Sequence, residues 1–448
     1  MPERLVVVGS DAAGMSAASQ ARRLRPDLEI VAFERSSYVS YSACGEPYYV
    51  GGLVDSIDSL VARTPEEFAA RHIEVHIRHE VSAIDLDKRQ VIVRNLQNSR
   101  SETVGFDHLM YATGSRPLRP DDVAGIDGPG VFGLRTLEDA VRLKQIADRG
   151  PGHVVLVGGG YIGIEMAEAM IDRGWKVTMA TSGRHVLERT LDDPIGERAD
   201  GAVKDYGVEL LTEARVTSVE DQGSQQVVSG EGFSLVADLV VIGLGAGPEV
   251  ELAAAAGIPL GVTGAVAVDD RQATSVPGVW SAGDCAEVRH RVSGLPVNML
   301  LGTVANKTGR IAGTNLTNGD ARFPGVLGTA ITRIGSTEIS RTGLKINDAT
   351  AAGFSPVTGF ARGTVSAGYW PDAAPMAALV IADRNTGQLL GGQIVGGPGA
   401  GKRIDVIATA IWAGMTAAEL AWVDLAYAPP FSGVWDLIHI AARRAADA

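Results

Sequence analysis

Short apolar runs that end in a glycine recur along the chain, and such runs are typical of buried parallel strands. The first run occupies residues 5–8 and leads directly into Gly9. Small apolar residues then recur at helical spacing until Pro26, which ends the helix, and a second apolar run follows at 29–33. The pattern therefore predicts a strand, a glycine turn, a helix and a second strand, which together form a βαβ unit.

The same order of elements recurs in the middle of the chain. Residues 154–157 form an apolar run that ends at Gly158, and Gly160 and Gly163 complete a GxGxxG pattern. A helical segment rich in Ala and Met follows, and then another apolar run at 176–180. Repetition of one supersecondary unit predicts two nucleotide-binding units with the same fold.

The first glycine turn also has the residue types that bind a dinucleotide. Gly9 and Gly14 are the outer glycines of the pattern, Asp11 replaces the middle glycine, and Glu34 ends the second strand. In a Rossmann unit the turn brings a pyrophosphate to a helix N-terminus, and an acid at the strand end accepts the ribose hydroxyls. One flavin and one nicotinamide nucleotide would use both units, which predicts a flavoprotein that takes hydride from NAD(P)H.

Three later segments repeat the combination of an apolar strand and a glycine turn, at residues 109–117, 238–245 and 278–285. The first falls near the end of the first unit and the second near the end of the other. In the third segment, Asp284 could accept hydrogen bonds from a flavin ribityl chain.

The last part of the chain has no nucleotide motif. Apolar runs flank a turn at Asn385-Thr386-Gly387, which predicts a β-hairpin, and helical patterns follow at 404–413 and 417–421. We therefore predict an α/β protein with two Rossmann-like domains and a C-terminal α+β interface domain. The predicted divisions are a first FAD-binding part (1–117), an NAD(P)H-binding domain (118–248), a second FAD-binding part (249–325) and the C-terminal domain (326–448).

The composition argues against several kinds of partner. The 448 residues carry a net charge of −13 and have a pI near 5.2, which argues against binding to nucleic acid. No apolar run is long enough to span a bilayer, and the N-terminus leads into a strand rather than a signal peptide. Two cysteines without an export signal indicate a reducing cytoplasm.

Cys44 is the candidate redox group. It lies in Ser40-Tyr41-Ser42-Ala43-Cys44-Gly45-Glu46-Pro47-Tyr48-Tyr49, soon after Glu34, and has no second cysteine nearby. A lone thiol can act as a nucleophile or form a mixed disulfide, but it cannot form a local dithiol pair. The alternative is a buried core cysteine. We predict that packing role for the other cysteine, Cys285.

Together these motifs resemble one family from end to end. They are the segment 40–49, Ala112-Thr113-Gly114, Ala282-Gly283-Asp284, and residues 305–310, 402–406 and 426–431. The chain resembles the FAD-dependent pyridine nucleotide–disulfide oxidoreductases. It looks most like their single-cysteine branch of coenzyme A disulfide reductases, persulfide and polysulfide reductases, and NADH oxidases. The resemblance implies reduction of a low-molecular-weight disulfide or persulfide, such as coenzyme A disulfide, by a homodimer with shared active sites.

The resemblance also implies roles for individual residues. Tyr369 and Tyr427, contributed by the partner subunit, would stabilise or protonate the leaving thiolate beside Cys44. The residues implied to contact coenzyme A are Ser16, Gln20, Arg23, Ser40, Arg63, Lys402 and Arg403. Those predicted to hold FAD are Gly9, Ala12, Ala13, Gly14, Glu34, Arg35, Ser40, Val81, Thr113, Gly114, Gly283 and Asp284. Those predicted to hold the nicotinamide nucleotide are Gly158, Gly160, Tyr161, Ile162, Gly163, Thr181, Ser182, Arg184 and Gly245.

The second unit lacks an acid where its second strand ends. Thr181 occupies that place, and Ser182 and Arg184 follow it. Hydroxyls and a guanidinium can bind a 2′-phosphate, so we predict a preference for NADPH over NADH that depends mainly on Arg184. The alternative is a relaxed pocket that accepts both nucleotides.

Two other functions remain open at this stage. One is an oxidase or peroxidase that uses a Cys44 sulfenic acid, and the other is a flavin-binding redox sensor. Oxidases of the family carry a histidine in the first glycine turn, and Ala12 at the matching position argues against oxygen chemistry. For the reductase, we expect the flavin and the following helix N-terminus to favour the Cys44 thiolate over the thiol.

Overall fold

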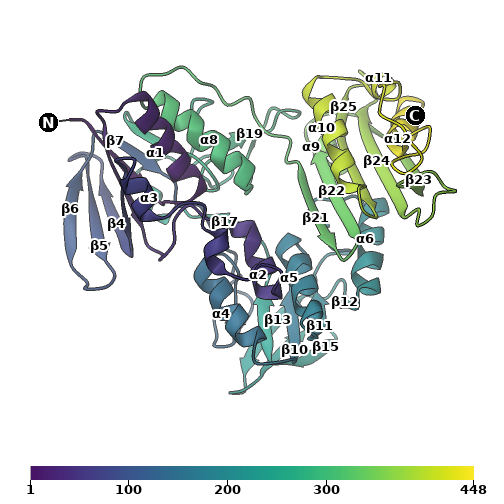
Figure 1. The fold of residues 1–448 in the computed structure, drawn as a ribbon, viewed down its shortest axis with the longest axis horizontal. Coiled ribbons are helices and arrows are strands. Elements are labelled where there is room, and N and C mark those ends of the chain that lie inside the picture. The colour runs from purple at the N-terminus through teal and green to yellow at the C-terminus, as the bar shows by residue number, and fades with distance from the viewer. Residues whose placement is uncertain (1) are drawn as a thin grey trace.

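The first apolar run forms the central strand of a five-stranded parallel sheet, in the lobe on the left of Figure 1. The computed structural model describes residues 2–448. The strand order is β18-β7-β1-β2-β3, with bounds Val279–Ser281, His108–Tyr111, Arg4–Val8, Glu29–Glu34 and Glu74–Ile77. The last of the three predicted strand-and-turn segments, at 278–285, therefore returns to the first sheet.

The second unit repeats this sheet in the lower lobe of Figure 1. Its order is β9-β16-β10-β11-β12, with bounds Val131–Phe132, Leu239–Ile242, His153–Val157, Lys176–Ala180 and Glu209–Leu211. All four strand pairs are parallel, and β10 takes the central place that β1 has in the first sheet. The predicted repeat of two Rossmann-like units is therefore confirmed.

Each sheet is covered on one face by helices and on the other by a small antiparallel sheet. In β1, Leu5 and Val7 pack toward the helices, whereas Val6 and Val8 pack toward β4–β6. The helices of the two units are α1 (Ala12–Leu24), α8 (Gly302–Asn315), α4 (Leu137–Ala147), α5 (Tyr161–Asp172) and α6 (Asp193–Asp205). The small sheets are β4–β6 (His79–Asp85, Gln90–Asn95, Ser101–Gly105) and β13–β15 (Val216–Asp221, Gln226–Gly230, Phe233–Ala237).

Helices α1 and α8 come from distant parts of the chain but pack backbone to backbone. A Cβ atom at Gly309 would lie 2.2 Å from the carbonyl oxygen of Ala13, and one at Gly313 would lie 2.4 Å from that of Ala17. These small residues allow a close helix–helix contact, which explains why the segment 305–313 contains glycines at this spacing.

Short elements connect the larger ones. The short helices are η1 (Ala43–Gly45), α2 (Glu46–Gly51), η2 (Ile57–Leu60), α3 (Pro65–Ala69) and α7 (Glu251–Ala255). Two strand pairs complete the units, β8 with β17 (Ser115–Pro117, Ala246–Pro248) and β19 with β20 (Val288–Arg289, Pro296–Val297). Among residues 2–448, no helix is long and apolar enough to cross a membrane.

The C-terminal domain, on the right of Figure 1, is built on an antiparallel sheet. Its order is β21-β22-β25-β24-β23, with bounds Ala330–Ile334, Thr337–Gly343, Leu389–Gly396, Pro375–Asp383 and Pro356–Thr364. The hairpin predicted at Asn385-Thr386-Gly387 joins β24 to β25. Its helices are α9 (Ile346–Ala351), η3 (Gly401–Arg403), α10 (Ile404–Trp412), α11 (Ala417–Leu420) and α12 (Leu437–Ala446).

The second unit and the C-terminal domain share one apolar core. Ile195 of α6 and Leu379 of β24 belong to the same buried cluster. A buried polar pair fixes the contact: the Gln393 amide donates to an Asp192 carboxylate oxygen at 2.6 Å and accepts from the Asp192 backbone N–H at 2.8 Å. The second unit is therefore held against the C-terminal sheet.

Candidate active site

The two glycine turns have the same close contacts in both units. Gly9 and Gly158 have φ angles of +94° and +111°. A Cβ atom at Gly9 would lie 2.2 Å from the Ala112 carbonyl oxygen, and one at Gly158 would lie 2.4 Å from that of Gly243. Only glycine fits these turns, because the left-handed backbone and the neighbouring strand exclude a side chain.

A cavity of about 420 Å³ opens beside the first glycine turn. Its lining includes five of the residues predicted to hold FAD: Gly9, Glu34, Arg35, Val81 and Thr113. The Glu34 carboxylate is fixed by two backbone N–H groups, of Ser10 and Ser36, each at 2.9 Å. His79, Glu80 and Glu249 line the same cavity, but nothing in the sequence pattern singled them out.

The other predicted flavin contacts meet at the N-terminus of α1. Ala12 and Ala13 begin the helix, and Gly283 lies so close that a Cβ atom there would be 2.8 Å from the Ala13 Cβ. The Ser115 hydroxyl donates to the Asp284 carboxylate at 2.9 Å, and burial raises the pKa of that carboxyl.

Arg135 is a cation of this region that the sequence analysis missed. Its guanidinium lies 3.5 Å from the Asp284 carboxylate and donates to the Ser115 carbonyl at 2.9 Å. It also lies 2.9 Å from the position that a Gly114 Cβ atom would take. No motif of the sequence analysis covers Arg135, which lies between β9 and α4.

This arrangement fits a dinucleotide such as FAD. The cavity has the Glu34 carboxylate for ribose hydroxyls, and the N-terminus of α1 lies at the adjoining glycine turn. The Ser10 hydroxyl in that turn is buried without a hydrogen-bond partner among residues 2–448. A buried hydroxyl without a hydrogen-bond partner, next to a turn in which only glycine fits, is consistent with a ligand in this place.

The segment that carries Cys44 is tied to the first glycine turn. The Ser40 backbone N–H donates to the Ser10 carbonyl at 3.0 Å, and that of Tyr41 donates to the Asp11 carboxylate at 3.0 Å. Asp11 replaces the middle glycine of the motif and anchors the segment that carries Cys44. Burial raises the pKa of the Asp11 carboxyl to about 6. The thiol of Cys44 lies exposed in η1, immediately before α2.

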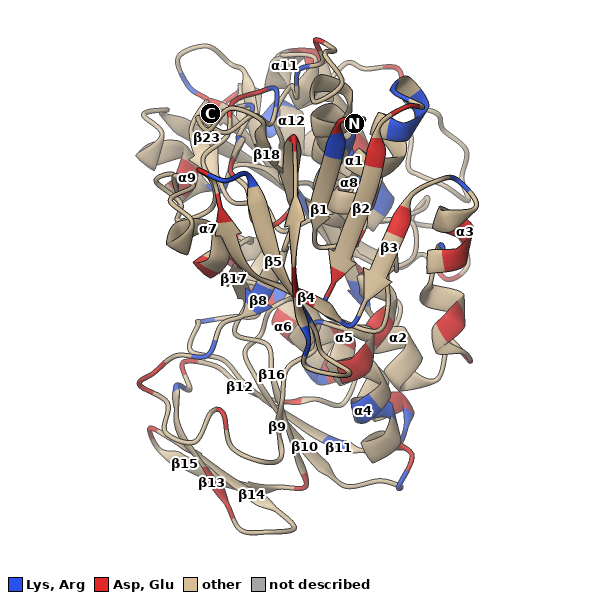
Figure 2. Cartoon of the chain, turned by 90° about the vertical axis from the view of Figure 1, so that its left-hand side faces the viewer, with Lys and Arg blue, Asp and Glu red and all other residues tan. Residues whose placement is uncertain are grey.

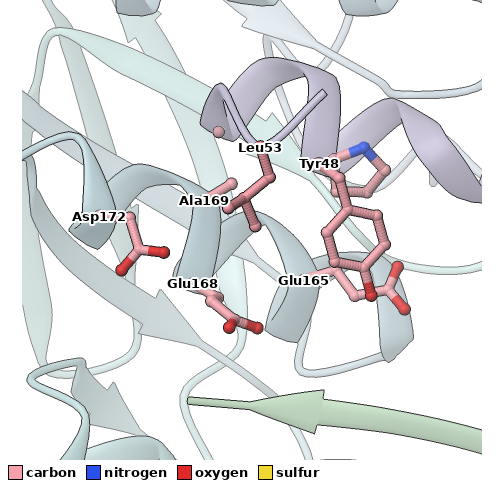
Figure 3. A pocket seen from close by; sticks show the side chains of 8 residues that line it. Tyr48, Leu53, Glu165, Glu168, Ala169 and Asp172 are labelled. Atoms are coloured by element: carbon pink, nitrogen blue, oxygen red, sulfur yellow. The ribbon is translucent and has the colours of Figure 1, made fainter. Parts of the chain in front are cut away.

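Carboxylates gather between α2 and α5, close to Cys44. Figure 3 shows Tyr48 and Leu53 around one small pocket with Glu165, Glu168 and Asp172 of α5. The Thr332 hydroxyl donates to Glu165 at 3.2 Å, and burial raises the pKa of Glu165 to about 7.

The expected Cys44 thiolate depends on the bound flavin, because the surrounding groups of this chain act in the opposite direction. Desolvation by the packed protein, and then the carboxylates of Glu165 and Glu46, raise the pKa of its thiol. Burial also raises the pKa of Glu46 to about 8. The groups of this chain therefore favour the neutral thiol, and α2, which is only six residues long, does not reverse that effect. Cys285 is fully buried and contacts the Tyr111 and Ala282 carbonyls, as its predicted packing role requires.

In the second unit, Gly160 caps α5, and Tyr161 and Ile162 form its first turn. A Cβ atom at Gly163 would lie 2.3 Å from the Gly158 carbonyl oxygen, and one at Gly14 would lie 2.0 Å from that of Gly9. Gly245, with a φ angle of +99°, follows β16 at the carboxyl edge of the sheet. The predicted nicotinamide contacts are therefore arranged around the second turn as the flavin contacts are around the first.

Arg184 is not the free cation that the predicted NADPH preference depends on. Its two terminal nitrogens donate to both carboxylate oxygens of Asp193 at 2.9 Å, and its Nε donates to Glu188 at 3.2 Å. Thr181 is buried, whereas Ser182 is exposed. A guanidinium held by two carboxylates offers little charge to a 2′-phosphate.

The residues predicted to contact coenzyme A lie in several separate parts of the fold. Ser16, Gln20 and Arg23 follow one face of α1 beside α8: the Ser16 hydroxyl donates to Asn306 at 2.9 Å, and the Gln20 amide donates to Thr314 at 3.2 Å. Arg63 lies two residues before α3, and its guanidinium is 6.0 Å from the centre of the Phe68 ring.

The C-terminal cations have different surroundings from those we predicted. The Lys402 side chain is 74% exposed and pairs with Asp405. Arg403 is only 15% exposed; its guanidinium bonds to Asp436 at 2.8 Å and to the backbone carbonyls of Gly399, Val365 and Phe431. Four of the five N–H groups of Arg403 thus hold loops of its own domain together, and one remains for a substrate phosphate.

Those loops carry the two predicted tyrosines. Tyr369 follows β23 and Tyr427 precedes α12, and their side chains are 76% and 48% exposed. A backbone hydrogen bond of 2.9 Å from Ala367 to Pro429 joins the loops. In Figure 1, β23 and α12 lie at the far end of the C-terminal domain from α2, so one chain does not bring these tyrosines to its own Cys44.

Figure 2 marks the charged residues along the ribbon. Segments of Lys and Arg are interspersed with segments of Asp and Glu in both lobes. This agrees with the net charge of −13.

Comparison with known proteins finds one protein family that matches nearly the whole chain. The model of pyridine nucleotide-disulphide oxidoreductases matches residues 3–309, and that of their dimerisation domain matches 329–437. The NAD(P)H sulfur oxidoreductase (CoA-dependent) of Pyrococcus furiosus is 37% identical over 443 residues, 98% of each chain. An NADH oxidase of Methanocaldococcus jannaschii is 33% identical over 99% of this chain and 98% of its own.

A solved structure gives the same result in three dimensions. Reduced Bacillus anthracis CoADR-RHD superposes with a TM-score of 0.94 at 30% identity, over 100% of this chain and 80% of that one. The two repeated glycine turns, the cavity beside Glu34 and the C-terminal sheet are thus parts of a known architecture. The chain belongs to the pyridine nucleotide–disulphide oxidoreductase family.

Proposed function

We propose that the protein is a flavin-dependent NAD(P)H oxidoreductase that reduces a low-molecular-weight disulfide or persulfide, such as coenzyme A disulfide, through Cys44. The observation that carries the proposal is a single exposed thiol anchored to the first glycine turn by Asp11 and Ser10, with no second cysteine to pair with it. The CoA-dependent sulfur oxidoreductase of Pyrococcus furiosus supports this class of acceptor.

Residues of the chain have separate parts in this reaction. Glu34, Thr113 and Asp284 would hold FAD, which when bound carries the electron pair of NAD(P)H to the sulfur of Cys44. The Cys44 thiolate attacks one substrate sulfur, forms a mixed disulfide and releases the other sulfur as a thiolate. The electron pair then cleaves this mixed disulfide, which restores the Cys44 thiolate and, with one proton, releases the second thiol. Because the chain raises the pKa of Cys44, a proton acceptor or the bound flavin must favour its thiolate.

The second half of the site comes from a second copy of the chain. Tyr369 and Tyr427 are exposed, and they adjoin β23 and α12, which lie away from α2 in Figure 1. Apolar side chains on the same domain are also exposed, including Phe431 at 72% and Val434 at 71%. A homodimer would cover such a surface and bring the tyrosine hydroxyls to the partner's thiol, where they would protonate the leaving thiolate.

The decisive experiment compares acceptors under anaerobic conditions. Without oxygen, NAD(P)H oxidation is followed with coenzyme A disulfide, coenzyme A persulfide or polysulfide as the acceptor. A separate aerobic assay has oxygen as the sole acceptor. Wild type, Cys44→Ser and the control Cys285→Ala are compared in each assay. We expect Cys44→Ser to retain FAD and to lose sulfur reduction, because a serine oxygen is a far poorer nucleophile than sulfur. Cys285→Ala should remain active. Undiminished turnover by Cys44→Ser would overturn the proposal.

The same experiment distinguishes the sulfur reductase from an NADH oxidase. The NADH oxidase among the relatives is the observation that favours it, and Ala12 in the first glycine turn is the one against it. Faster NADH consumption with oxygen than with any sulfur acceptor would indicate the oxidase.

A further inference from the structure

The end of β11 is the place where a Rossmann unit distinguishes NADH from NADPH. An acid there accepts both ribose hydroxyls and repels a 2′-phosphate, whereas a free cation binds that phosphate. Here the strand is followed by Thr181, Ser182 and Gly183, none of which carries a charge. Thr181 is buried, and its hydroxyl accepts a hydrogen bond from the Gly183 backbone N–H at 3.4 Å.

A carboxylate reaches this place from the loop that follows. One oxygen of Glu188 lies 2.6 Å from the position that a Cβ atom at Gly183 would take, so its carboxylate covers the backbone of Gly183. The absence of a side chain at Gly183 leaves the room for it. The other Glu188 oxygen accepts from Arg184 at 3.2 Å.

The loop that carries Glu188 is fixed to the second glycine turn. The Leu187 backbone N–H donates to the Gly159 carbonyl at 2.8 Å, and Val186 packs against Gly159. The Lys345 ammonium, from the C-terminal domain, donates to the Glu188 backbone carbonyl. Glu188 is thus held beside the turn from two sides rather than free to swing into solvent.

The nearby cation does not cancel this negative charge. Arg184 binds Asp193 through two hydrogen bonds of 2.9 Å and Glu188 through one of 3.2 Å. Glu188 and Asp193 share this one guanidinium, and the other nearby cation, Lys345, binds the Glu188 backbone carbonyl rather than either carboxylate. Arg184 therefore holds Glu188 in position, instead of facing a phosphate.

We propose that Glu188 supplies the carboxylate that the end of β11 lacks, and that it selects NADH over NADPH. This carboxylate accepts hydrogen bonds from the ribose hydroxyls of NADH and repels the 2′-phosphate of NADPH. The inference reverses the preference predicted from the sequence, and it rests on the proposed function only in placing the nicotinamide nucleotide at the second glycine turn.

The test uses the FAD-loaded protein and two probes, 5′-AMP and 2′,5′-ADP, whose binding is measured by titration calorimetry without any sulfur acceptor. We expect wild type to bind 5′-AMP at least tenfold more tightly than 2′,5′-ADP. Glu188→Gln should reduce this ratio about tenfold, and Glu188→Asp should retain most of it. Glu197→Gln removes an exposed carboxylate of α6 and should leave the ratio unchanged. The kcat/KM ratio for NADH and NADPH should follow the same order.

The outcomes separate this inference from the proposed function. Tighter binding of 2′,5′-ADP by wild type, or an unchanged ratio in Glu188→Gln with 5′-AMP still bound, would overturn the inference and leave the sulfur reductase standing. Failure of both probes and of both reduced nucleotides to bind wild type would overturn the two together. A normal probe ratio with no reduction of any sulfur acceptor would overturn only the proposed function.

Discussion

Replacement of Arg403 by alanine should destabilise the C-terminal domain rather than weaken substrate binding directly. The side chains of Arg403 and Asp436 are only 15% and 10% exposed, and their ion pair is 2.8 Å long. The same guanidinium bonds to the carbonyls of Gly399 and Val365, each at 2.7 Å. The variant would leave a buried carboxylate without its partner.

The size of the effect follows from that burial. Removing one partner of a buried ion pair typically costs about 3–5 kcal/mol, because the remaining charge stays desolvated. Asp436 also caps α12 by accepting from the Ile438 N–H at 3.0 Å, so it cannot easily turn to solvent. We expect Arg403→Ala to lose about 3 kcal/mol. At roughly 2–4 °C per kcal/mol, the unfolding temperature of this domain should fall by about 6–12 °C.

Lys402→Ala is the matched control, since it removes a neighbouring cation. The Lys402 side chain is 74% exposed and its partner Asp405 is 54% exposed, so their pair should contribute less than about 1 kcal/mol. The assays are scanning calorimetry and the KM for coenzyme A disulfide. An Arg403→Ala protein as stable as wild type, with a raised KM shared by Lys402→Ala, would refute this reasoning and restore the two residues as phosphate ligands.

Three further changes test other parts of the site. Tyr427→Phe should slow reduction of the sulfur substrate but leave flavin reduction by NAD(P)H nearly unchanged in stopped-flow traces; equal losses in both would indicate a misfolded interface instead. Gly309→Ala would place a Cβ atom 2.2 Å from the Ala13 carbonyl, so it should cost about 1–3 kcal/mol and lower the FAD-to-protein ratio. Gly302→Ala, with open space around its Cβ position, should do neither. Burial raises the pKa of Glu165 from 4.5 to about 7, so the stability gained from its protonated form is lost as the pH rises through that range. The unfolding temperature of Glu165→Gln should therefore improve relative to wild type between pH 4.5 and 7, and a constant difference would contradict the assignment.

The parts of the fold that could be predicted are those in which backbone geometry restricts the residue type. Gly9 and Gly158 must be glycine because each has a positive φ and touches the neighbouring strand. Apolar runs of strand length then locate both parallel sheets. The antiparallel sheets β4–β6 and β13–β15 were not predicted, because their strands are half exposed and give only a weak apolar pattern.

Site residues were harder to predict wherever partners distant in sequence decide their role. Arg403 and Arg184 were interpreted as free cations, since a sequence shows a charge but not the carboxylates that neutralise it. Arg135 and Glu188 gave no signal, because each reaches its site from a loop whose path depends on the tertiary structure. Cys44, in contrast, could be found because the residues around it form a local motif.

The close contact of α1 with α8 has a consequence for biosynthesis. The first sheet needs β18, and its helical face needs α8, but both emerge from the ribosome only after the whole of the second unit. The second unit is nearly continuous in sequence, so we expect it to fold first. Until α8 is synthesised, the apolar face of the N-terminal strands stays exposed. Truncated nascent chains that end before Gly302 should therefore depend on chaperones, and FAD should be captured only once residues 302–315 have been synthesised.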